Sequence, residues 1–91
     1  MEFEYDAAKS ISNKERHGID FEEGQQLWKD PFAFSVPSRY ADEPRSLVIG
    51  MIKETCWTAI VTHREERIRI ISIRRSRTYE SKTYDKRRGI G

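Results

Sequence analysis

The stretch Ile68-Arg69-Ile70-Ile71-Ser72-Ile73-Arg74-Arg75 decides the fold. It holds four isoleucines within six positions, and β-branched side chains favour a pleated, half-buried strand. Because side chains alternate along a strand, one face is expected to carry Ile68, Ile70, Ser72 and Arg74, and the other Arg69, Ile71, Ile73 and Arg75. Both faces are apolar in the middle, which predicts a strand near the centre of a sheet. The two arginines at its end suit phosphate binding, although solvated end residues are an equally good interpretation.

The residues before this strand predict two further strands, at 46–52 and 56–62. The short connections 53–55 and 63–66 predict an antiparallel meander of the three strands. After the meander, residues 76–88 favour a helix with Ser76 or Thr78 as its N-cap and Gly89 as its terminator. This helix is so polar that we expect it to be loosely attached, or stabilised by a partner or substrate.

The first part of the chain predicts a short strand at 2–5, two helices and a strand at 32–36. Asp6 is expected to cap a helix that ends at His17, with Gly18 as the αL residue after it. An apolar stripe on this helix comprises Ala7, Ala8 and Ile11. A second helix starts at Asp20, where Glu23 completes a capping-box pattern, and stops at Asp30-Pro31. Together these elements predict a compact α+β domain spanning residues 1–91, with two N-terminal helices, an antiparallel meander and one C-terminal helix.

The composition is polar, with 36% hydrophobic and 35% charged residues. The formal charge is unevenly divided: residues 1–46 contain six basic and ten acidic residues (−4), and residues 47–91 contain eleven basic and five acidic residues (+6). This asymmetry indicates either a polyanionic partner for the basic half or docking of one half on the other.

Several classes of function are not supported by the sequence. No apolar run reaches the roughly 18 residues of a membrane span, and no signal peptide opens the chain, so we expect a cytoplasmic protein without membrane association. Cys56 is the only cysteine, which excludes a disulfide framework. With only His17 and His63 beside it, we expect no metal site and no cofactor. His17 is more readily explained as a cationic residue at a helix end than as a catalytic group.

The residues that suit phosphate chemistry form two expected clusters. The first, near the turn at 63–66, comprises Arg64, Glu66 and Arg67, with His63 beside it. The second, near the C-terminal helix, comprises Arg74, Arg75, Arg77 and Tyr84, and Arg69 lies between the two. Eight residues of strand separate the clusters by roughly 25 Å, so they are not expected to surround a single phosphate.

The chain resembles the BrnT toxins. The resemblance rests on motifs spread over almost the whole length: Phe3-x-Tyr5-Asp6-x-x-Lys9, Asn13-x-x-Arg16-His17-Gly18-Ile19-x-Phe21, Asp30-Pro31, Ile49-Gly50, Arg64 and Arg69-Ile70-Ile71-Ser72-x-Arg74. It implies a RelE-like fold and a metal-independent endoribonuclease that blocks translation. It also implies a cognate antitoxin encoded alongside, expected to be a BrnA-like, DNA-binding dimer that forms a hetero-oligomer with the toxin.

Such an enzyme would promote attack of a ribose 2′-hydroxyl on the adjacent phosphate, and fixed guanidinium groups would stabilise the charge that develops. We expect Arg74 and Arg75 to do so, with Arg64 and Arg69 on flanking phosphates and Arg67, Arg77 and His63 as further RNA contacts. The candidate general bases are Glu66, His63 and Tyr84, each of which is equally well explained as a rim, turn or core residue. Two alternatives stay open, namely a non-catalytic nucleic-acid-binding module and a small interaction domain that docks on an acidic partner.

Overall fold

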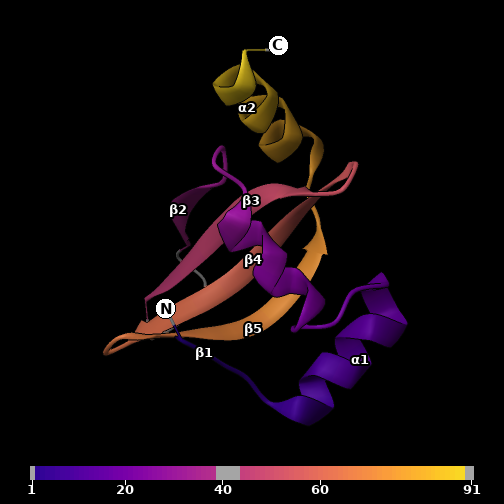
Figure 1. The fold of residues 1–91 in the computed structure, drawn as a ribbon, viewed down its shortest axis with the longest axis vertical. Helices are drawn as coiled ribbons and strands as arrows, with labels where there is room; N and C mark the ends of the chain where they lie inside the picture. The colour runs from indigo at the N-terminus through magenta and orange to yellow at the C-terminus, as the bar shows by residue number, and fades with distance from the viewer. Residues whose placement is uncertain (1, 39–43, 90–91) are drawn as a thin grey trace.

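A computed structural model describes residues 2–38 and 44–89 of the chain. The elements in order are β1 (Glu2–Glu4), α1 (Ala7–His17), the 3₁₀ helix η1 (Glu23–Lys29), β2 (Phe34–Ser38), β3 (Arg45–Ile52), β4 (Thr55–Arg64), β5 (Arg67–Arg75) and α2 (Thr78–Arg88) (Figure 1). The strands form one five-stranded sheet in the order β1-β5-β4-β3-β2. The expected α+β class is therefore confirmed.

Two details of the expected architecture are wrong. The consecutive strands β2 to β5 pair antiparallel, but β1 adds to β5 in parallel, so the sheet is mixed rather than a pure meander. The second N-terminal helix is a single 3₁₀ segment, although Asp20 and Glu23 do exchange the expected capping hydrogen bonds. The position predicted for β5, near the centre of the sheet, is confirmed, since β5 lies between β1 and the middle strand β4. Edge strand β2 includes Pro37, which edge strands tolerate.

Helix α1 has the predicted ends but not the predicted buried face. Asp6 accepts hydrogen bonds from the amides of Ala8 and Lys9, and Gly18 adopts a left-handed φ of 83°. The buried residues are Ser10 and Asn13, whereas Ala7, Ala8 and Ile11 are exposed. Polar residues face inward because the helix lies beside the backbone of β5 and of the segment after α1, whose amide and carbonyl groups need partners.

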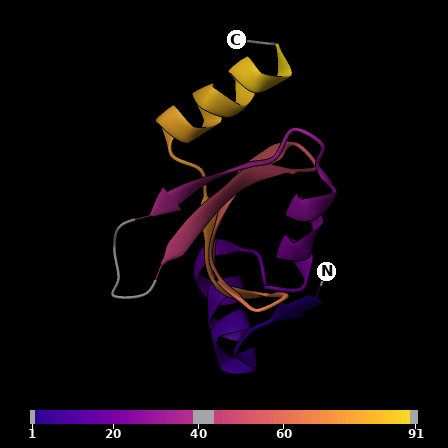
Figure 2. The same cartoon turned by 90° about the vertical axis from the view of Figure 1, so that its left-hand side faces the viewer.

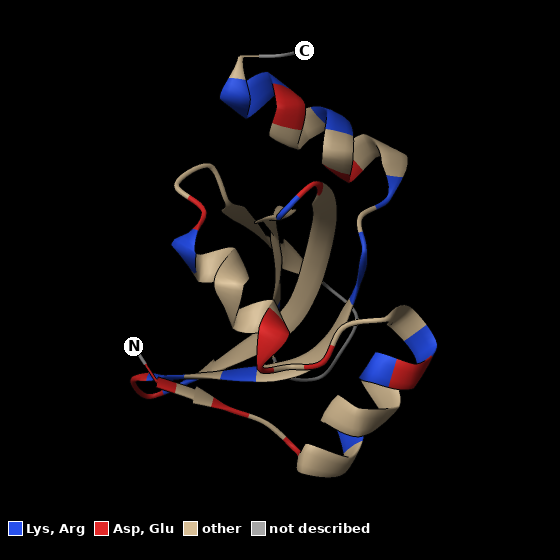
Figure 3. Ribbon diagram, turned by 45° about the vertical axis from the view of Figure 1, so that its right-hand side comes forward, with Lys and Arg blue, Asp and Glu red and all other residues tan. Residues whose placement is uncertain are grey.

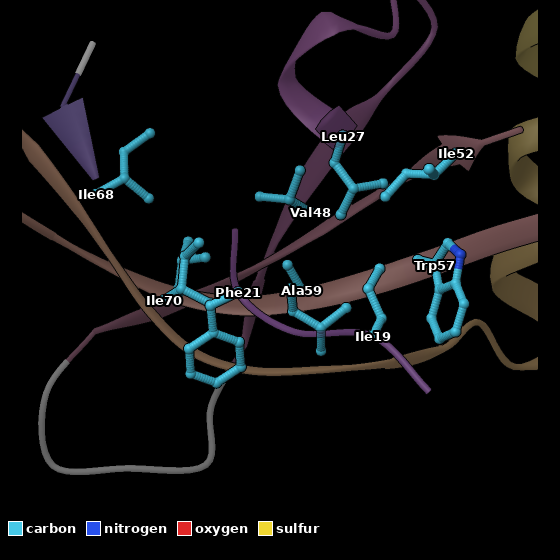
Figure 4. Packing of buried hydrophobic residues seen from close by; sticks show 11 residues of the cluster. Ile19, Phe21, Leu27, Val48, Ile52, Trp57, Ala59, Ile68 and Ile70 are labelled. Carbon is cyan, nitrogen blue, oxygen red and sulfur yellow. The ribbon is translucent and has the colours of Figure 1, made fainter. Parts of the chain in front are cut away.

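The core lies between the sheet and the segment that contains Ile19, Phe21 and η1 (Figure 4). Figure 2 shows η1 on one side of the curved sheet and α2 at its upper end. Leu27 of η1 is fully buried against the sheet. A Cβ atom on Gly24 would lie 2.0 Å from Cδ1 of Ile73, so η1 can approach β5 only because this residue is glycine. We name the covered surface of the sheet the core face and the opposite surface the outer face.

A β-bulge in β5 changes which isoleucines reach the core. Ile60 pairs with Ser72 while its neighbour Val61 pairs with Ile70, so one residue of β5 has no partner on β4. The extra residue shifts the alternation, and Ile73 joins Ile68 and Ile70 in the core. The strict alternation expected for this strand is therefore wrong beyond Ile70.

Helix α2 packs across one end of the sheet through a few polar anchors (Figure 1). Its N-cap position is Arg77, whose amide donates to Glu80, so neither Ser76 nor Thr78 caps it. Glu80 and Tyr84 are buried at 2% exposure each. The helix is therefore attached more firmly than its composition predicts. No helix of the described residues is long and apolar enough to cross a membrane.

Candidate functional site

The register of the sheet places Arg74 on the outer face. Arg74 pairs with Thr58 of β4. Two residues further along β4, Ile60 lies on the same face and pairs with Leu47 of β3. The pair Ala59 and Ile73, by contrast, belongs to the core. Because the bulge precedes Arg74, the same shift that buries Ile73 turns Arg74 away from the core.

A cavity of about 220 Å³ opens on this outer face, which we name the outer-face groove. It is lined by Ser38, Arg45, Leu47, Ile60, Arg74, Arg77 and Tyr79. Its apolar residues, Leu47 and Ile60, are half-buried, while the Tyr79 ring is 60% exposed. Among the residues that the structure describes, three guanidinium groups line the groove and no carboxylate does. Basic residues also lie along the segment that joins β5 to α2 (Figure 3).

Arg74 is held at the groove by Glu80. Its Nη1 donates to Oε1 at 2.8 Å and its Nη2 donates to Oε2 at 3.0 Å. Oε1 also accepts from the amide of Arg77 at 2.7 Å and from the Thr58 hydroxyl at 3.0 Å. Burial acts to raise the pKa of Glu80, but these hydrogen bonds outweigh it and hold the pKa below its ordinary value. The hydrogen bond to Glu80 in turn raises the pKa of Arg74.

Arg45 is a second constrained cation in the groove. Its Nε is buried and has no hydrogen-bond partner within residues 2–38 and 44–89. A buried N–H without an acceptor is costly, so this group is suited to receive an acceptor from a ligand.

The predicted cluster near the turn at 63–66 forms, but apart from the groove. Arg64 lies opposite Arg67 at the ends of β4 and β5, and Glu66 is exposed in the turn. Arg67 pairs with Glu2 at 3.3 Å, and Arg69 pairs with Glu4 at 3.8 Å. Five residues of strand separate Arg69 from Arg74, which corresponds to roughly 16 Å.

The remaining predicted residues point elsewhere. Arg75 is opposite Trp57, on the core face, and its guanidinium lies 5.9 Å from the centre of the indole ring. His63 pairs with the core residue Ile68, at the far end of β4. The Tyr84 hydroxyl donates to Asp30 at 2.5 Å. The structure thus groups Arg74 with Arg77 and separates both from Arg75, His63 and Tyr84.

The buried Tyr84–Asp30 contact shifts both pKa values. Burial and the hydrogen bond to the carboxylate raise the pKa of Tyr84 to about 12. Burial also opposes ionisation of Asp30, but the Tyr84 hydroxyl and the amides of Met51 and Phe32 hold its pKa below the ordinary value. This pair anchors α2 to the end of η1, and its polar groups already have hydrogen-bond partners within the protein.

The sequence reasoning missed Arg45, Tyr79 and Glu80. Arg45 lies two residues before Leu47, so extending the predicted strand by one residue would have placed both on one face. Glu80 is the third residue after the N-cap of α2, the usual position of a capping carboxylate. Nothing in the local sequence indicates that Tyr79 lies beside the end of β3.

One comparison with known proteins identifies a family. Residues 5–80 match the family model described as ribonuclease toxin, BrnT, of type II toxin-antitoxin system. The match begins just after β1 and covers α1, η1, β2 to β5 and the first turn of α2. No curated protein matches the chain.

Proposed function

The chain belongs to the BrnT family of ribonuclease toxins of type II toxin-antitoxin systems, and from this premise we propose that it is a metal-independent endoribonuclease whose active site is the outer-face groove. Cleavage of RNA by this site inhibits translation in the cytoplasm. The observation that carries the proposal is the lining of the groove, in which, among residues 2–38 and 44–89, three arginines and an exposed tyrosine surround an apolar floor without a carboxylate.

The groove matches the two parts of a nucleotide. The floor formed by Leu47 and Ile60, together with the Tyr79 ring, offers apolar surface to an unpaired base. The guanidinium groups of Arg45 and Arg77 offer donors to phosphate oxygens. Duplex RNA would not present its bases to such a cavity, so the proposed substrate is single-stranded.

The chemistry follows from where charge develops. The ribose 2′-oxygen forms a bond to phosphorus while the bond from phosphorus to the 5′-oxygen breaks, which leaves a 2′,3′-cyclic phosphate and a 5′-hydroxyl end. Negative charge grows on the non-bridging oxygens, and each well-placed guanidinium donor lowers the barrier by about 3 kcal/mol. The proton lost by the 2′-oxygen and the proton gained by the 5′-oxygen are exchanged with water. His63, Glu66 and Tyr84 are not among the groove-lining residues, so this mechanism assigns them no proton transfer.

Flanking nucleotides extend the contact along the sheet. Arg64 and Arg69 lie on the same face as Arg74, towards the opposite end of β5. At roughly 16 Å from the groove, Arg69 is placed to bind a phosphate two or more nucleotides away rather than the scissile one. A cognate antitoxin, which we propose to be a DNA-binding BrnA-like dimer, inhibits the enzyme by covering this basic face.

The test is cleavage of a long RNA by the purified protein in EDTA. We expect fragments that end in 2′,3′-cyclic phosphate, and we expect an oligonucleotide with 2′-deoxyribose at the cleavage site to resist. Binding without any fragments would contradict the enzymatic proposal and favour a nucleic-acid-binding module. Fragments that appear only after a divalent metal is added would contradict the metal-independent mechanism. Absence of both binding and cleavage would favour an interaction domain.

A further inference from the structure

The contacts of Arg74 leave one edge of its guanidinium group unused. A guanidinium has five N–H donors in a fixed plane. Two of them, one on Nη1 and one on Nη2, bind Glu80, and the second on Nη1 binds the carbonyl of Arg75 at 3.2 Å. The Nε–H and the second Nη2–H remain, and they lie on the same edge. No acceptor contacts this edge within the described part of the chain.

Glu80 is itself fixed. Its side chain is 2% exposed, and Thr58 and the amide of Arg77 hold the oxygen that faces Nη1 of Arg74. The Thr58 side chain is fully buried and also contacts the Ser76 hydroxyl at 2.8 Å. The carboxylate therefore has little freedom to rotate, and neither has the guanidinium that it binds.

We propose that Glu80 is a positioning residue that presents the Nε and Nη2 edge of Arg74 to a phosphate in the outer-face groove. This inference rests on the proposed function. The edge matches the spacing of two phosphate oxygens, so Arg74 can bind one phosphate through two parallel hydrogen bonds. Since Glu80 neutralises much of the charge of Arg74, the contribution of this arginine depends on orientation more than on net charge.

The test compares single-turnover RNA cleavage by the wild type, Glu80→Gln, Arg74→Ala and the double variant. An amide at position 80 would place an N–H against an N–H of Arg74, so Glu80→Gln should lower the cleavage rate constant by at least ~10-fold. The affinity for an uncleavable 2′-deoxy analogue should fall by a smaller factor than the rate constant, because the charge on the phosphate oxygens grows in the transition state. Arg74→Ala should lower the cleavage rate constant by at least the same factor. The double variant should cleave as slowly as Arg74→Ala alone.

Stability is the second readout. Arg74→Ala leaves Glu80 as a buried, unpaired charge, so the double variant should be more stable than Arg74→Ala while its cleavage stays equally low. Arg87→Ala is the control for the attachment of α2, because Arg87 anchors the helix to the carbonyl of Phe32 without contacting Arg74. It should leave cleavage unchanged. If Glu80→Gln does not fold, Thr58→Val removes one hydrogen bond to the same carboxylate and should lower the rate by a smaller factor.

The outcomes separate this inference from the proposed function. A wild type that does not cleave RNA overturns both. A wild type that cleaves, with Glu80→Gln or Thr58→Val folded and equally fast, overturns only the role of Glu80. Additive losses from Glu80→Gln and Arg74→Ala, or an equal loss in Arg87→Ala, would show that Glu80 serves only to attach α2.

Discussion

The side-chain amide of Asn13 completes the edge of β5 where β1 ends. Its Nδ2 donates to the carbonyls of Ile19 and Ile73 at 2.8 and 2.9 Å, and its Oδ1 accepts from the amide of Ile73 at 3.2 Å. One residue thereby satisfies three buried backbone groups, which explains why a polar face of α1 is buried.

We therefore expect Asn13→Ala to lower the free energy of unfolding by about 3 kcal/mol, because three backbone groups lose their partner and each costs about 1 kcal/mol. Urea-induced unfolding measures the change, and Ser12→Ala, an exposed substitution on the same helix, is the control. A loss equal to that of the control would show that water replaces the amide without cost.

Single residues also mark the limit of what the sequence reveals. Asp6 and Gly18 defined the ends of α1 correctly, because N-caps and αL residues act through the local backbone. The inward direction of Asn13 and the pairing of Arg74 with Glu80 were not predicted. Both depend on contacts between segments whose relative placement no local pattern encodes.

At the scale of elements, the packing of η1 on β5 depends on the bulge that turns Ile73 inward. The alternation of residues 68–75 predicted the strand, but a bulge leaves no signature in a run of isoleucines, and so the expectation that Ile73 lies on the face opposite to Ile68 and Ile70 was wrong. The same shift brings Arg74 to the outer face. Strand positions were thus predictable from composition, while the side of the sheet that each residue faces beyond the bulge was not.

The contact between Gly24 and Ile73 tests this packing. Gly24→Ala should destabilise the fold by about 1–3 kcal/mol, because the new methyl group overlaps Cδ1 of Ile73. Ile73→Val removes that atom and alone should cost about 1 kcal/mol. In the double variant we expect less destabilisation than the sum, by at least about 1 kcal/mol in a double-mutant cycle. Strict additivity would contradict the close approach.

The hydrogen bond from Tyr84 to Asp30, which anchors α2, makes the stability of the fold depend on pH. The pKa of Tyr84 is about 12 in the folded state, above the ordinary 10.0. The contribution of Tyr84 to folding stability is therefore complete below pH 10 and is lost as pH rises through 12. Tyr84→Phe should be less stable than the wild type at pH 8 by about 1 kcal/mol, through loss of the hydrogen bond to Asp30. The difference should shrink towards pH 12 in denaturant unfolding. A difference that stays constant would contradict the raised pKa.

For the whole molecule, the uneven division of charge has a structural counterpart. The formal net charge is +2, yet the outer-face groove gathers Arg45, Arg74 and Arg77, and no acidic residue of the described ranges 2–38 and 44–89 lines it. Part of the asymmetry is neutralised within the fold, since Glu2 and Glu4 of β1 pair with Arg67 and Arg69 of β5. Neutralisation within the fold is therefore confirmed for β1 and β5, whereas a polyanionic partner for the groove stays a prediction.

The salt dependence of RNA binding should reflect this distribution. For an uncleavable single strand, the slope of log affinity against log salt is about −0.7 for each phosphate neutralised. We expect Arg77→Ala to reduce its magnitude by about 0.7, whereas Lys29→Ala, on η1, should leave it unchanged. Equal effects of the two substitutions would indicate binding to overall positive charge rather than to the groove.

The central claim, that the groove is the catalytic site, is tested most directly by the single-turnover RNA cleavage rate in EDTA of two charge-matched double variants. Arg45→Ala/Arg77→Ala removes two cations from the groove, and Lys9→Ala/Lys29→Ala removes two exposed cations from α1 and η1. With unfolding curves confirming that both are folded, the first should cleave at least ~100-fold more slowly than the wild type and the second at the wild-type rate. Equal rates for the two variants would contradict the claim.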